Sequence, residues 1–459
     1  MEVNVVNKEN IYNKLPVFLQ NMAIHAEGWK INRRRYDGAY NSLLKSAQER
    51  TFWTEPQLHK WQEQKLKDFF SSICKNSYWS DQFLKYGIDL VQDSPFEVLS
   101  KLPILNKSEV QKNRLNIINP VPEETISRHT SGTTGGGLVF PETHYSEQLQ
   151  WAIWWRYRNW NNIDKHTWCT YLGGRSIVPI QQDITPYWRV NKPARQVMYS
   201  LYHLSEKTAR QYLDDIQRRR LPWIHGYPSY ISLLANYVID SQRIGQFDFV
   251  QSITTGAENL LDTQISIIEK AFGVKPKQHY GLAEGVANIS MCPEGRLHVD
   301  EDFSLVEFDP IEGLEGAHRI IGTNWNNTAF PLLRYDTNDV AILTPNQSCA
   351  CGRAGRIVAR IDGRQEDYLV LPNGVKIGRL DHIFKDMINI KEARIVQNSV
   401  TNARVEIVKR EGYRDEDEKM LLREFVSRVG GDIHLEFAYL DQLPRTKSGK
   451  LKFVESNIK

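Results

Sequence analysis

Hydrophobic positions in the first hundred residues follow a helical period. From Pro56 to Gly87, apolar residues recur mainly at steps of three and four; they are Leu58, Trp61, Leu66, Phe69, Phe70 and Ile73. This spacing predicts an amphipathic helix that packs one face inward. Cys74 falls beside that face and is predicted to belong to the core. The basic run Arg33–Arg35 could touch an anion, but we interpret it as a solvated helix face.

Between residues 168 and 280, short apolar runs alternate with amphipathic segments. They predict strands at 168–172, 222–226, 247–255 and 275–280, and helices at 205–220, 230–241 and 260–272. Ser205 is the predicted N-cap of the first of these helices. Strands separated by helices favour right-handed crossovers and a parallel sheet.

The loops that follow these strands hold the unusual residues. They are Gly173–Arg175, Gly226–Pro228, Gly256–Glu258 and Gly281–Glu284. In open α/β sheets, ligands bind beyond the carboxyl ends of parallel strands. Four such loops therefore predict one composite site.

The pattern changes after residue 303. Short strands at 303–309, 318–323 and 339–343 predict a β-rich subdomain, and segments after Asp362 predict a small α+β domain with helices at 381–389 and 416–429. We expect an α/β fold with a large N-terminal domain over residues 1–362, which has a helical extension at 1–100. A smaller C-terminal domain is expected over 363–459.

Composition narrows the class of protein. Hydrophobic residues make up 41% of the 459 residues and charged residues 25%, which is a globular balance. The formal net charge of +3 gives no reason to expect a nucleic-acid partner. No apolar run approaches the ~18 residues that cross a bilayer, and the first residues lack a signal-peptide pattern, so we expect a cytoplasmic protein.

The segment Thr130–Gly137 combines four glycines with four hydroxyl side chains. Glycines allow several backbone N–H groups to converge, and hydroxyls add donors, so the segment can cradle phosphates. It is not a Walker loop, because no Gly-Lys-Ser/Thr ends it. A flexible surface turn is the alternative.

This segment resembles the phosphate loop of the adenylate-forming superfamily, which includes the acyl-CoA synthetases. Further segments resemble other motifs of that family in the expected order: Gly256–Glu258 the adenine loop, His279–Glu284 the aromatic-Gly-x-x-Glu segment, Arg334–Asp339 the ribose segment, Gly363–Asp367 the hinge, and Pro444–Lys450 the lysine segment. The resemblance implies that ATP is bound by Thr130, Ser131, Gly132, Thr133, Thr134, Gly135, Gly256, Ala257, Glu258, His279, Tyr280, Gly281 and Asp339.

Within the superfamily, the chain most resembles the phenylacetate-CoA ligase branch. Lys101–Leu105 and His225–Ser229 are similar to CapK-like proteins of capsular polysaccharide biosynthesis. Two departures stand out. Gly136 occurs near the place where the phosphate loop of the family continues to a lysine, and Asn338 replaces the glycine before the ribose-binding aspartate. Since Asn tolerates a left-handed backbone, the second turn can survive.

The resemblance assigns roles that suit the side chains. Glu284 would hold Mg²⁺ against phosphate oxygens, with a structural salt bridge as the alternative. Tyr280 offers a flat face to adenine, and Asp339 can accept both ribose hydroxyls, although it could also cap a turn. The implied catalytic residues are Lys450, Glu284 and Arg364, and Glu366 is the hinge about which the C-terminal domain rotates between two half-reactions.

Four residues form a candidate metal set. Cys292, His298, Cys349 and Cys351 supply three thiolates and one imidazole, which is a complete tetrahedral set for structural zinc. They would stabilise the β-rich part over 292–351. Unrelated buried thiols are the alternative. Cys169 lies within a predicted strand and is expected to be core.

The acyl pocket is less defined. Trp151, Trp154 and Trp155 either line it or simply pack, whereas Leu149, Ile153, Tyr157 and Trp160 share a helical face that is expected to be core. Residues at the predicted strand ends are the candidates for substrate contact; they are Tyr171, Gly174, Arg175, His225 and Tyr227.

Three functions remain open. The first is an ATP-dependent ligase that forms an acyl-adenylate and pyrophosphate from a small carboxylic acid and passes the acyl group to a thiol such as coenzyme A. The second keeps the adenylation but makes an amide or ester directly on an amine or a sugar during capsule or O-antigen assembly. The third is a zinc-stabilised binding protein without catalysis.

Overall fold

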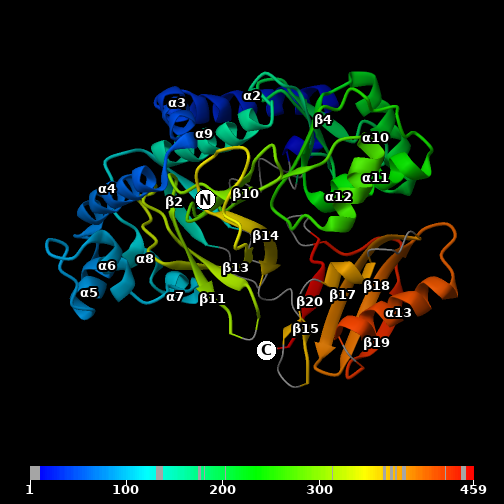
Figure 1. Ribbon diagram of the computed structural model, residues 1–459. Coiled ribbons are helices and arrows are strands. Elements are labelled where there is room, and N and C mark those ends of the chain that lie inside the picture. The colour runs from blue at the N-terminus through cyan, green and yellow to red at the C-terminus, as the bar shows by residue number, and fades with distance from the viewer. Residues whose placement is uncertain are drawn as a thin grey trace. The chain divides into compact units, whose positions relative to one another are not determined.

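The computed structural model describes residues 11–130, 138–173, 177–179, 181–201, 203–312, 314–364, 369–372, 376–377, 380–384, 389–429, 431–445 and 451–458. The chain divides into two compact units (Figure 1). The first unit comprises Met1–Asn32, Lys165–Lys277 and Arg364–Lys459, and the second comprises Arg33–Asp164 and Gln278–Gly363.

The first unit contains the predicted parallel sheet. Its strands run in the order β7 (Ser252–Thr255), β6 (Trp223–Gly226), β3 (Cys169–Leu172), β5 (Gln196–Tyr199) and β4 (Trp188–Asn191). Strands β7, β6, β3 and β5 are parallel, whereas β4 pairs antiparallel with β5. The α/β fold class is therefore confirmed.

Helices separate the parallel strands as predicted. They are α10 (Glu206–Arg219), α11 (Pro228–Asp240) and α12 (Asp262–Phe272). Ser205 is the N-cap of α10, and Arg220 ends it in a left-handed conformation. The predicted strand at 247–255 is shorter than expected, because Phe247 and Val250 close a buried turn before β7 begins.

The hairpin β4–β5 was not predicted. Arg189, in the middle of β4, is fully buried and therefore interrupts the apolar pattern that marks a buried strand. Its guanidinium donates to Gln20 Oε1 (2.7 Å) and Gln182 Oε1 (2.9 Å). These partners satisfy the buried charge, and local sequence does not reveal Gln20, which is 169 residues away.

The C-terminal part of the first unit is the predicted small α+β fold. Its sheet has the order β19 (His434–Tyr439), β18 (Asn402–Lys409), β17 (Ile390–Ser399) and β20 (Val454–Ser456). Helix α13 (Asp415–Val429) packs on its core, and β15 (Leu369–Val370) pairs with β16 (Lys376–Ile377). The described part of the predicted helix 381–389 is a 3₁₀-helix, η3 (Leu380–Phe384).

The second unit contains the β-rich part. Its strand order is β11 (Leu305–Pro310), β12 (Ala317–Thr323), β13 (Tyr335–Leu343), β14 (Ile357–Arg364), β10 (Leu297–Val299), β9 (Asn288–Met291) and β8 (Lys277–Gly281). A separate hairpin joins β1 (Thr125–His129) to β2 (Val139–Thr143). The predicted β-rich subdomain thus exists, although its strands begin and end at slightly different residues.

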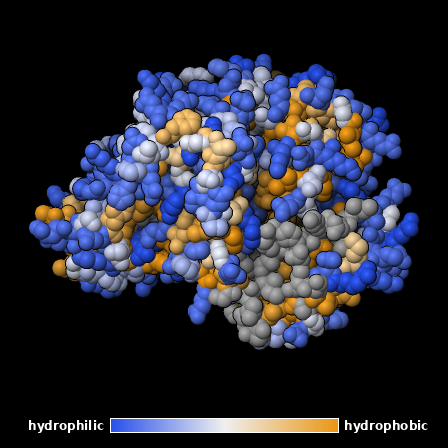
Figure 2. Space-filling model, viewed as in Figure 1, coloured by the Kyte–Doolittle hydropathy of each residue, from blue (hydrophilic) through white to orange (hydrophobic). Residues whose placement is uncertain are grey.

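Helices form the N-terminal part, as predicted. They are α2 (Val17–Tyr36), α3 (Tyr40–Glu49), η1 (Arg50–Phe52), α4 (Glu55–Ile73), α5 (Ser77–Lys85), α6 (Pro95–Lys101), α7 (Lys107–Lys112) and α8 (Arg114–Ile117). Helix α9 (His144–Trp160) follows β2. None of the described helices is long and apolar enough to cross a bilayer. Hydrophilic residues cover most of the face coloured in Figure 2.

Three predictions for the N-terminal part were wrong in detail. The single helix at 56–87 is two helices, because Asn76 caps α5 by accepting from Trp79 N (3.2 Å). Cys74 is exposed rather than core, since it lies at the end of α4 where the chain turns outward. The run Arg33–Arg35 is only partly solvated, because Arg34 and Arg35 pair with the buried Glu147.

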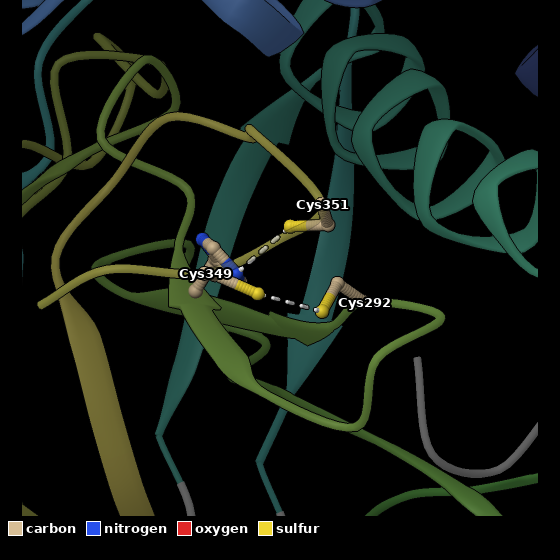
Figure 3. A group of neighbouring side chains, drawn as sticks. Cys292, Cys349 and Cys351 are labelled. Atoms are coloured by element: carbon tan, nitrogen blue, oxygen red, sulfur yellow. Dashed lines mark hydrogen bonds between the residues drawn. The ribbon is translucent and has the colours of Figure 1, made fainter. Parts of the chain in front are cut away.

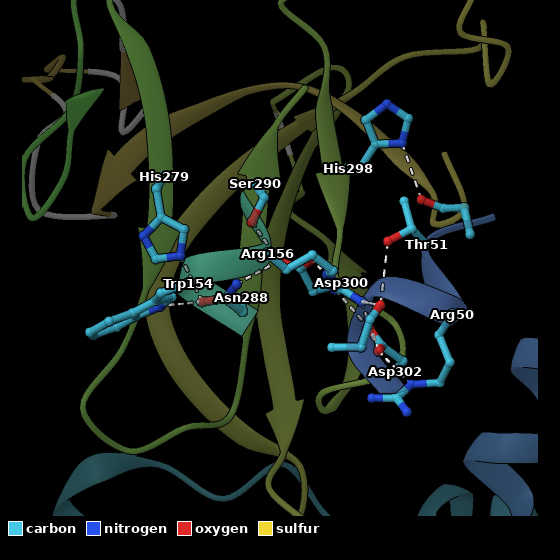
Figure 4. A network of polar contacts seen from close by, with 12 residues as sticks. Arg50, Thr51, Trp154, Arg156, His279, Asn288, Ser290, His298, Asp300 and Asp302 are labelled. Atoms are coloured by element: carbon cyan, nitrogen blue, oxygen red, sulfur yellow. Dashed lines mark hydrogen bonds and ion pairs between the residues drawn. The ribbon is translucent and has the colours of Figure 1, made fainter. Parts of the chain in front are cut away.

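A buried polar network organises the second unit (Figure 4). Arg156 in α9 donates to Asp302 Oδ1 and Oδ2 (2.9 Å each) and to Asp300 Oδ1 (2.6 Å). Arg50 also donates to Asp302 Oδ2 (2.7 Å). All four side chains are at most 5% exposed, so each charge depends on the others for stabilisation.

We predict that Asp302→Asn lowers the free energy of unfolding by about 3–5 kcal/mol, because two buried guanidiniums lose their shared carboxylate. Urea denaturation measures this, with Glu63→Gln at the exposed Lys67 pair as the control that leaves the midpoint unchanged. Burial alone would raise the pKa of Asp302, but Arg156 and Arg50 hold it below its usual value. The stabilisation should therefore be complete above about pH 4 and lost only at lower pH. An unchanged midpoint in Asp302→Asn would contradict the prediction.

Candidate functional site

Two residues from separate predicted motifs meet in the second unit. The Tyr280 hydroxyl, on β8, donates to Asp339 Oδ2, on β13, over 2.8 Å. The two residues are 59 positions apart in sequence. A predicted adenine-side aromatic ring and a predicted ribose-binding carboxylate thus lie side by side.

A β-bulge orients Asp339. Between β12 and β13 the register shifts, so that Arg319 pairs with Val340 and Ile321 with Asp336. Asn338 has φ +59°, which is the left-handed backbone expected for the position where the family has glycine. Its N–H donates to Asp336 Oδ1 (2.8 Å), and the Asp339 N–H donates to Thr337 Oγ1 (3.1 Å). The turn therefore survives the substitution.

Glu284 lies in the same unit. It is 8% exposed, and its backbone carbonyl accepts from Asn324 Nδ2 (2.9 Å). Burial raises the pKa of Tyr280 well above its usual value, and the charges of Asp339 and, more weakly, Glu284 raise it further. Tyr280 consequently remains a protonated donor at neutral pH, close to two carboxylates.

His279 is held from behind by residues that the sequence did not mark. Its Nε2 donates to Asn288 Oδ1 (2.9 Å), which also accepts from Trp154 Nε1 (3.0 Å). Burial lowers the pKa of His279 to about 3, helped by the nearby charge of Arg158. The imidazole is therefore neutral at physiological pH. Its hydrogen bond to Asn288 fixes the orientation of the His279 ring, next to Tyr280 in the chain.

In the first unit, the carboxyl ends of the parallel strands carry aromatic and imidazole groups. Tyr171 and His225 are register partners on β3 and β6, with ring centroids 5.9 Å apart. His225 Nδ1 lies 2.8 Å from Thr254 Oγ1, which also accepts from Trp223 Nε1 (2.8 Å). Thr254 was not predicted as a site residue. Its place near the carboxyl end of β7 nevertheless follows from the rule that ligands bind beyond the carboxyl ends of parallel strands.

Close backbone packing explains one glycine of this group. A Cβ at Gly226 would lie 2.1 Å from the backbone oxygen of Leu172. Tyr227, the next residue, donates its N–H to that same oxygen (3.0 Å) and is the N-cap of α11. Tyr227 is therefore the single residue between β6 and α11, which fixes its position at the end of the strand.

The loop Gly256–Glu258 has an unusual backbone. Ala257 has φ +68°, a conformation that costs a non-glycine residue about 1–2 kcal/mol. The Glu258 carboxylate accepts from Ser229 N (3.2 Å) in the first turn of α11 and from Leu451 N (2.6 Å). Strain of this kind persists where surrounding contacts determine the conformation, and it is typical of functional loops.

Several predicted site residues lie outside the described residues. The two ends of the predicted phosphate loop are joined, since Thr130 N donates to Leu138 O (2.9 Å) and Leu138 N donates to Thr130 Oγ1 (2.8 Å). The predicted site residues that lie outside the described residues are Ser131, Gly132, Thr133, Thr134, Gly135, Gly174, Arg175, the side chain of Arg364, Glu366 and Lys450.

The tryptophans of α9 mainly pack. Trp151 lies beneath the Arg35 guanidinium (4.0 Å to the ring centroid), and Trp155 Nε1 donates to the Tyr36 hydroxyl (3.0 Å). Leu149, Ile153 and Tyr157 are buried as predicted. Trp160, by contrast, is only half-buried, beside Arg156 and Arg353.

The four candidate metal ligands gather at one point (Figure 3). Their donor atoms all lie within 4.8 Å of one another. Cys292 Sγ is 3.8 Å from Cys349 Sγ, and Cys351 Sγ is 3.4 Å from His298 Nε2. Tetrahedral zinc with its usual bond lengths requires about 3.8 Å between sulfurs and about 3.5 Å between sulfur and nitrogen.

The surroundings suit a cation. His298 Nδ1 lies 3.2 Å from Ala354 O, which can only accept, so the proton is on Nδ1 and Nε2 is free to ligate. Burial raises the pKa of the Cys292 thiol to about 11, which a divalent ion would reverse by stabilising the thiolate. The residues therefore fit structural zinc, which would stabilise the fold rather than take part in chemistry.

We predict about one zinc per chain in protein purified without added metal, measured by elemental analysis. Cys349→Ser should lower both the zinc content and the melting temperature, because binding energy at a structural site is folding energy. Cys74→Ser, at the exposed cysteine, is the control that changes neither. Metal-free protein in which Cys349 and Cys351 are freely alkylated would contradict the prediction.

Comparison with known proteins finds relatives in sequence and in structure. Residues 369–457 match the family model of the CapK C-terminal domain. Protein CapK of Staphylococcus aureus is 27% identical over 456 residues, which cover 98% of this chain and 99% of that protein. A phenylacetate-coenzyme A ligase of Thermus thermophilus is 33% identical over 133 residues, covering 27% of this chain and 29% of that protein.

Structural comparison extends the likeness. The crystal structure of a 2-hydroxyisobutyryl-CoA ligase in the postadenylation state, in complex with R3-HIB-AMP, superposes with a TM-score of 0.70. It is 14% identical, and the match covers 89% of this chain and 91% of that one. At this identity the superposition shows a shared fold. The chain is therefore similar in sequence to CapK over its full length and to a phenylacetate-coenzyme A ligase over part of it, and it shares the fold of the 2-hydroxyisobutyryl-CoA ligase.

Proposed function

We propose that the protein activates a small carboxylic acid with ATP, forming an acyl-adenylate and pyrophosphate, and then transfers the acyl group to a thiol such as coenzyme A. The observation that carries this proposal is the 2.8 Å hydrogen bond between Tyr280 and Asp339. It joins two groups that separate motifs predict for adenine and ribose. Acid-dependent exchange of labelled pyrophosphate into ATP, over a panel of carboxylic acids, tests it.

The geometry suits nucleotide binding. The Tyr280 hydroxyl donates to Asp339 and so orients that carboxylate to accept from ribose hydroxyls. Because its pKa is raised, Tyr280 stays protonated in that role. Glu284 would hold Mg²⁺, which neutralises phosphate charge when bound. A lysine such as Lys450 would neutralise the charge that develops as the carboxylate attacks the α-phosphate.

Relatives support the reaction type. The structural neighbour carries R3-HIB-AMP and is named a CoA ligase, and two curated relatives are named phenylacetate-coenzyme A ligases. The chemistry that these names share is the joining of an acid to coenzyme A, and the AMP compound bound by the structural neighbour supports an acyl-adenylate as the intermediate. The first half-reaction then requires ATP and the acid, and the second requires the acceptor.

The C-terminal domain matches the CapK model rather than a model named for a coenzyme A ligase, so a second kind of acyl acceptor stays an alternative. In that alternative the adenylate reacts directly with an amine or a sugar hydroxyl. Consumption of coenzyme A distinguishes the two. Absence of exchange with every acid tested would instead favour a non-catalytic binding protein.

We predict that Asp339→Asn raises the KM for ATP in the exchange reaction by about tenfold to a hundredfold, with a smaller effect on kcat. Hydrogen bonds to a charged group contribute about 1.5–3 kcal/mol, and the amide loses this charge. Asp309→Asn, a carboxylate of β11 that pairs with Arg319, is the control. An unchanged KM in Asp339→Asn would remove the ribose assignment.

We also predict that Lys450→Ala slows adenylation by about 10²–10³-fold, the usual range for losing one donor to the transition state. Transfer from a preformed acyl-adenylate should remain nearly intact. Glu366→Pro should do the reverse, since fixing φ at the hinge would block rotation after the first step. Separate assays of pyrophosphate release and of acyl transfer show which half-reaction each variant slows. Equal losses for Lys450→Ala in both assays would exclude a role confined to the first step.

A further inference from the structure

One carboxylate in the first unit joins two segments that are far apart in sequence. Glu258 Oε2 accepts from Ser229 N, in the first turn of α11, and Glu258 Oε1 accepts from Leu451 N. Leu451 directly follows Lys450. The backbone beside the predicted catalytic lysine is therefore tied to the start of α11.

A second contact lies on the other side of the lysine segment. Arg445 is buried, with 8% of its side chain exposed, and its guanidinium pairs with Glu392 of β17. The same guanidinium lies 4.7 Å from the ring centroid of Tyr230, also in the first turn of α11. Its Nε and Nη1 have no hydrogen-bond partner among the residues that the structure describes. A buried cation that rests on an aromatic face gains more than an exposed one.

Further along α11, polar contacts continue on the same side of the helix. Asn236 Nδ2 donates to Lys391 O (3.1 Å), and Asn236 Oδ1 accepts from Arg410. The Lys391 ammonium lies 4.2 Å from the ring centroid of Tyr237. Helical positions that are three, four or seven apart share a face, so the contacted residues form one docking face on α11. We define this docking face as Ser229, Tyr230, Asn236, Tyr237 and Asp240.

The contacts between the docking face and the C-terminal part are mainly polar. They are hydrogen bonds, one ion pair between Arg410 and Asp240 (3.7 Å) and cation–π contacts, rather than a continuous apolar core. Each partner from the C-terminal part is a cation or a backbone group. Polar surfaces of this kind separate more readily than apolar ones, which suits a contact that is made and broken.

We propose that Glu258 and Arg445 are positioning residues for the first half-reaction, because they anchor the chain on both sides of the Lys450 segment to the first turn of α11. This inference rests on the proposed function. Glu392 orients Arg445, and Asn236 extends the same docking face. Acyl transfer, which does not use Lys450, does not need these anchors.

The test compares both half-reactions in Arg445→Met. This change keeps the apolar stem and removes the charge. We expect acid-dependent pyrophosphate exchange to slow by about tenfold to a hundredfold, the effect of losing a charged contact. Transfer from a preformed acyl-adenylate should stay within about twofold. Arg445→Lys keeps a cation over Tyr230 and should restore part of the exchange rate.

Two further variants separate positioning from general stability. Glu392→Gln removes the partner of Arg445 and should reproduce the selective loss. Glu406→Gln makes the same chemical change at an equally buried carboxylate of β18, which pairs with Arg394 and Arg404. It should leave the ratio of the two half-reactions unchanged. Equal loss of both half-reactions in Arg445→Met and Glu392→Gln would overturn the proposal.

A distance measurement gives a result that does not depend on turnover. Spin labels at Arg210→Cys in α10 and Arg423→Cys in α13, in a Cys74→Ser background, report how the C-terminal part lies against α11. We expect Arg445→Met to broaden the distance distribution, and Glu406→Gln to leave it as in the parent. An unchanged distribution in Arg445→Met would overturn the anchoring role. Lack of exchange by the wild type with every acid would instead contradict the proposed function, while the distances would still test the anchors.

Discussion

The guanidinium of Arg156 is the charge on which the second unit depends. It is fully buried and bonds both Asp300 and Asp302, so it offsets the cost of burying both carboxylates. The network continues in two directions from this point. Asp300 accepts from Asn288 Nδ2 (2.5 Å), whose other side-chain atom holds His279 in front of Tyr280. His279, one of the two candidate nucleotide residues of β8, is therefore linked to the same buried charge.

The other direction leads to the candidate metal site. Arg50 shares Asp302 with Arg156, and the carbonyl of the next residue, Thr51, accepts from Ala354 N (2.8 Å). Ala354 O in turn accepts from His298 Nδ1. The candidate metal ligands and the candidate nucleotide residues thus share one polar framework. A structural ion here would strengthen the same network that orients β8.

Irregular backbone places the candidate functional side chains. Asn338 and Ala257 both have positive φ, and each immediately precedes a carboxylate, Asp339 or Glu258. Regular strands alternate their side chains strictly between two faces, so a bulge or a strained turn is needed to aim one carboxylate at a chosen partner. The strain is local, and the hydrogen bonds that each carboxylate makes help to offset it.

Sequence alone determined the elements whose cause is local. The alternation of strands and helices between residues 168 and 280, the cap at Ser205 and the left-handed turn at Asn338 all follow from residue type and spacing. Tertiary structure alone decided the buried strand around Arg189, the pairing of Arg34 and Arg35 with Glu147, the Asn288 contact that holds His279 and the pairing of Arg445 with Glu392. The physical reason is common to all four. A buried polar group is stable only with its partner, and these partners lie between 9 and 169 residues away, where only the folded chain brings them within hydrogen-bonding distance.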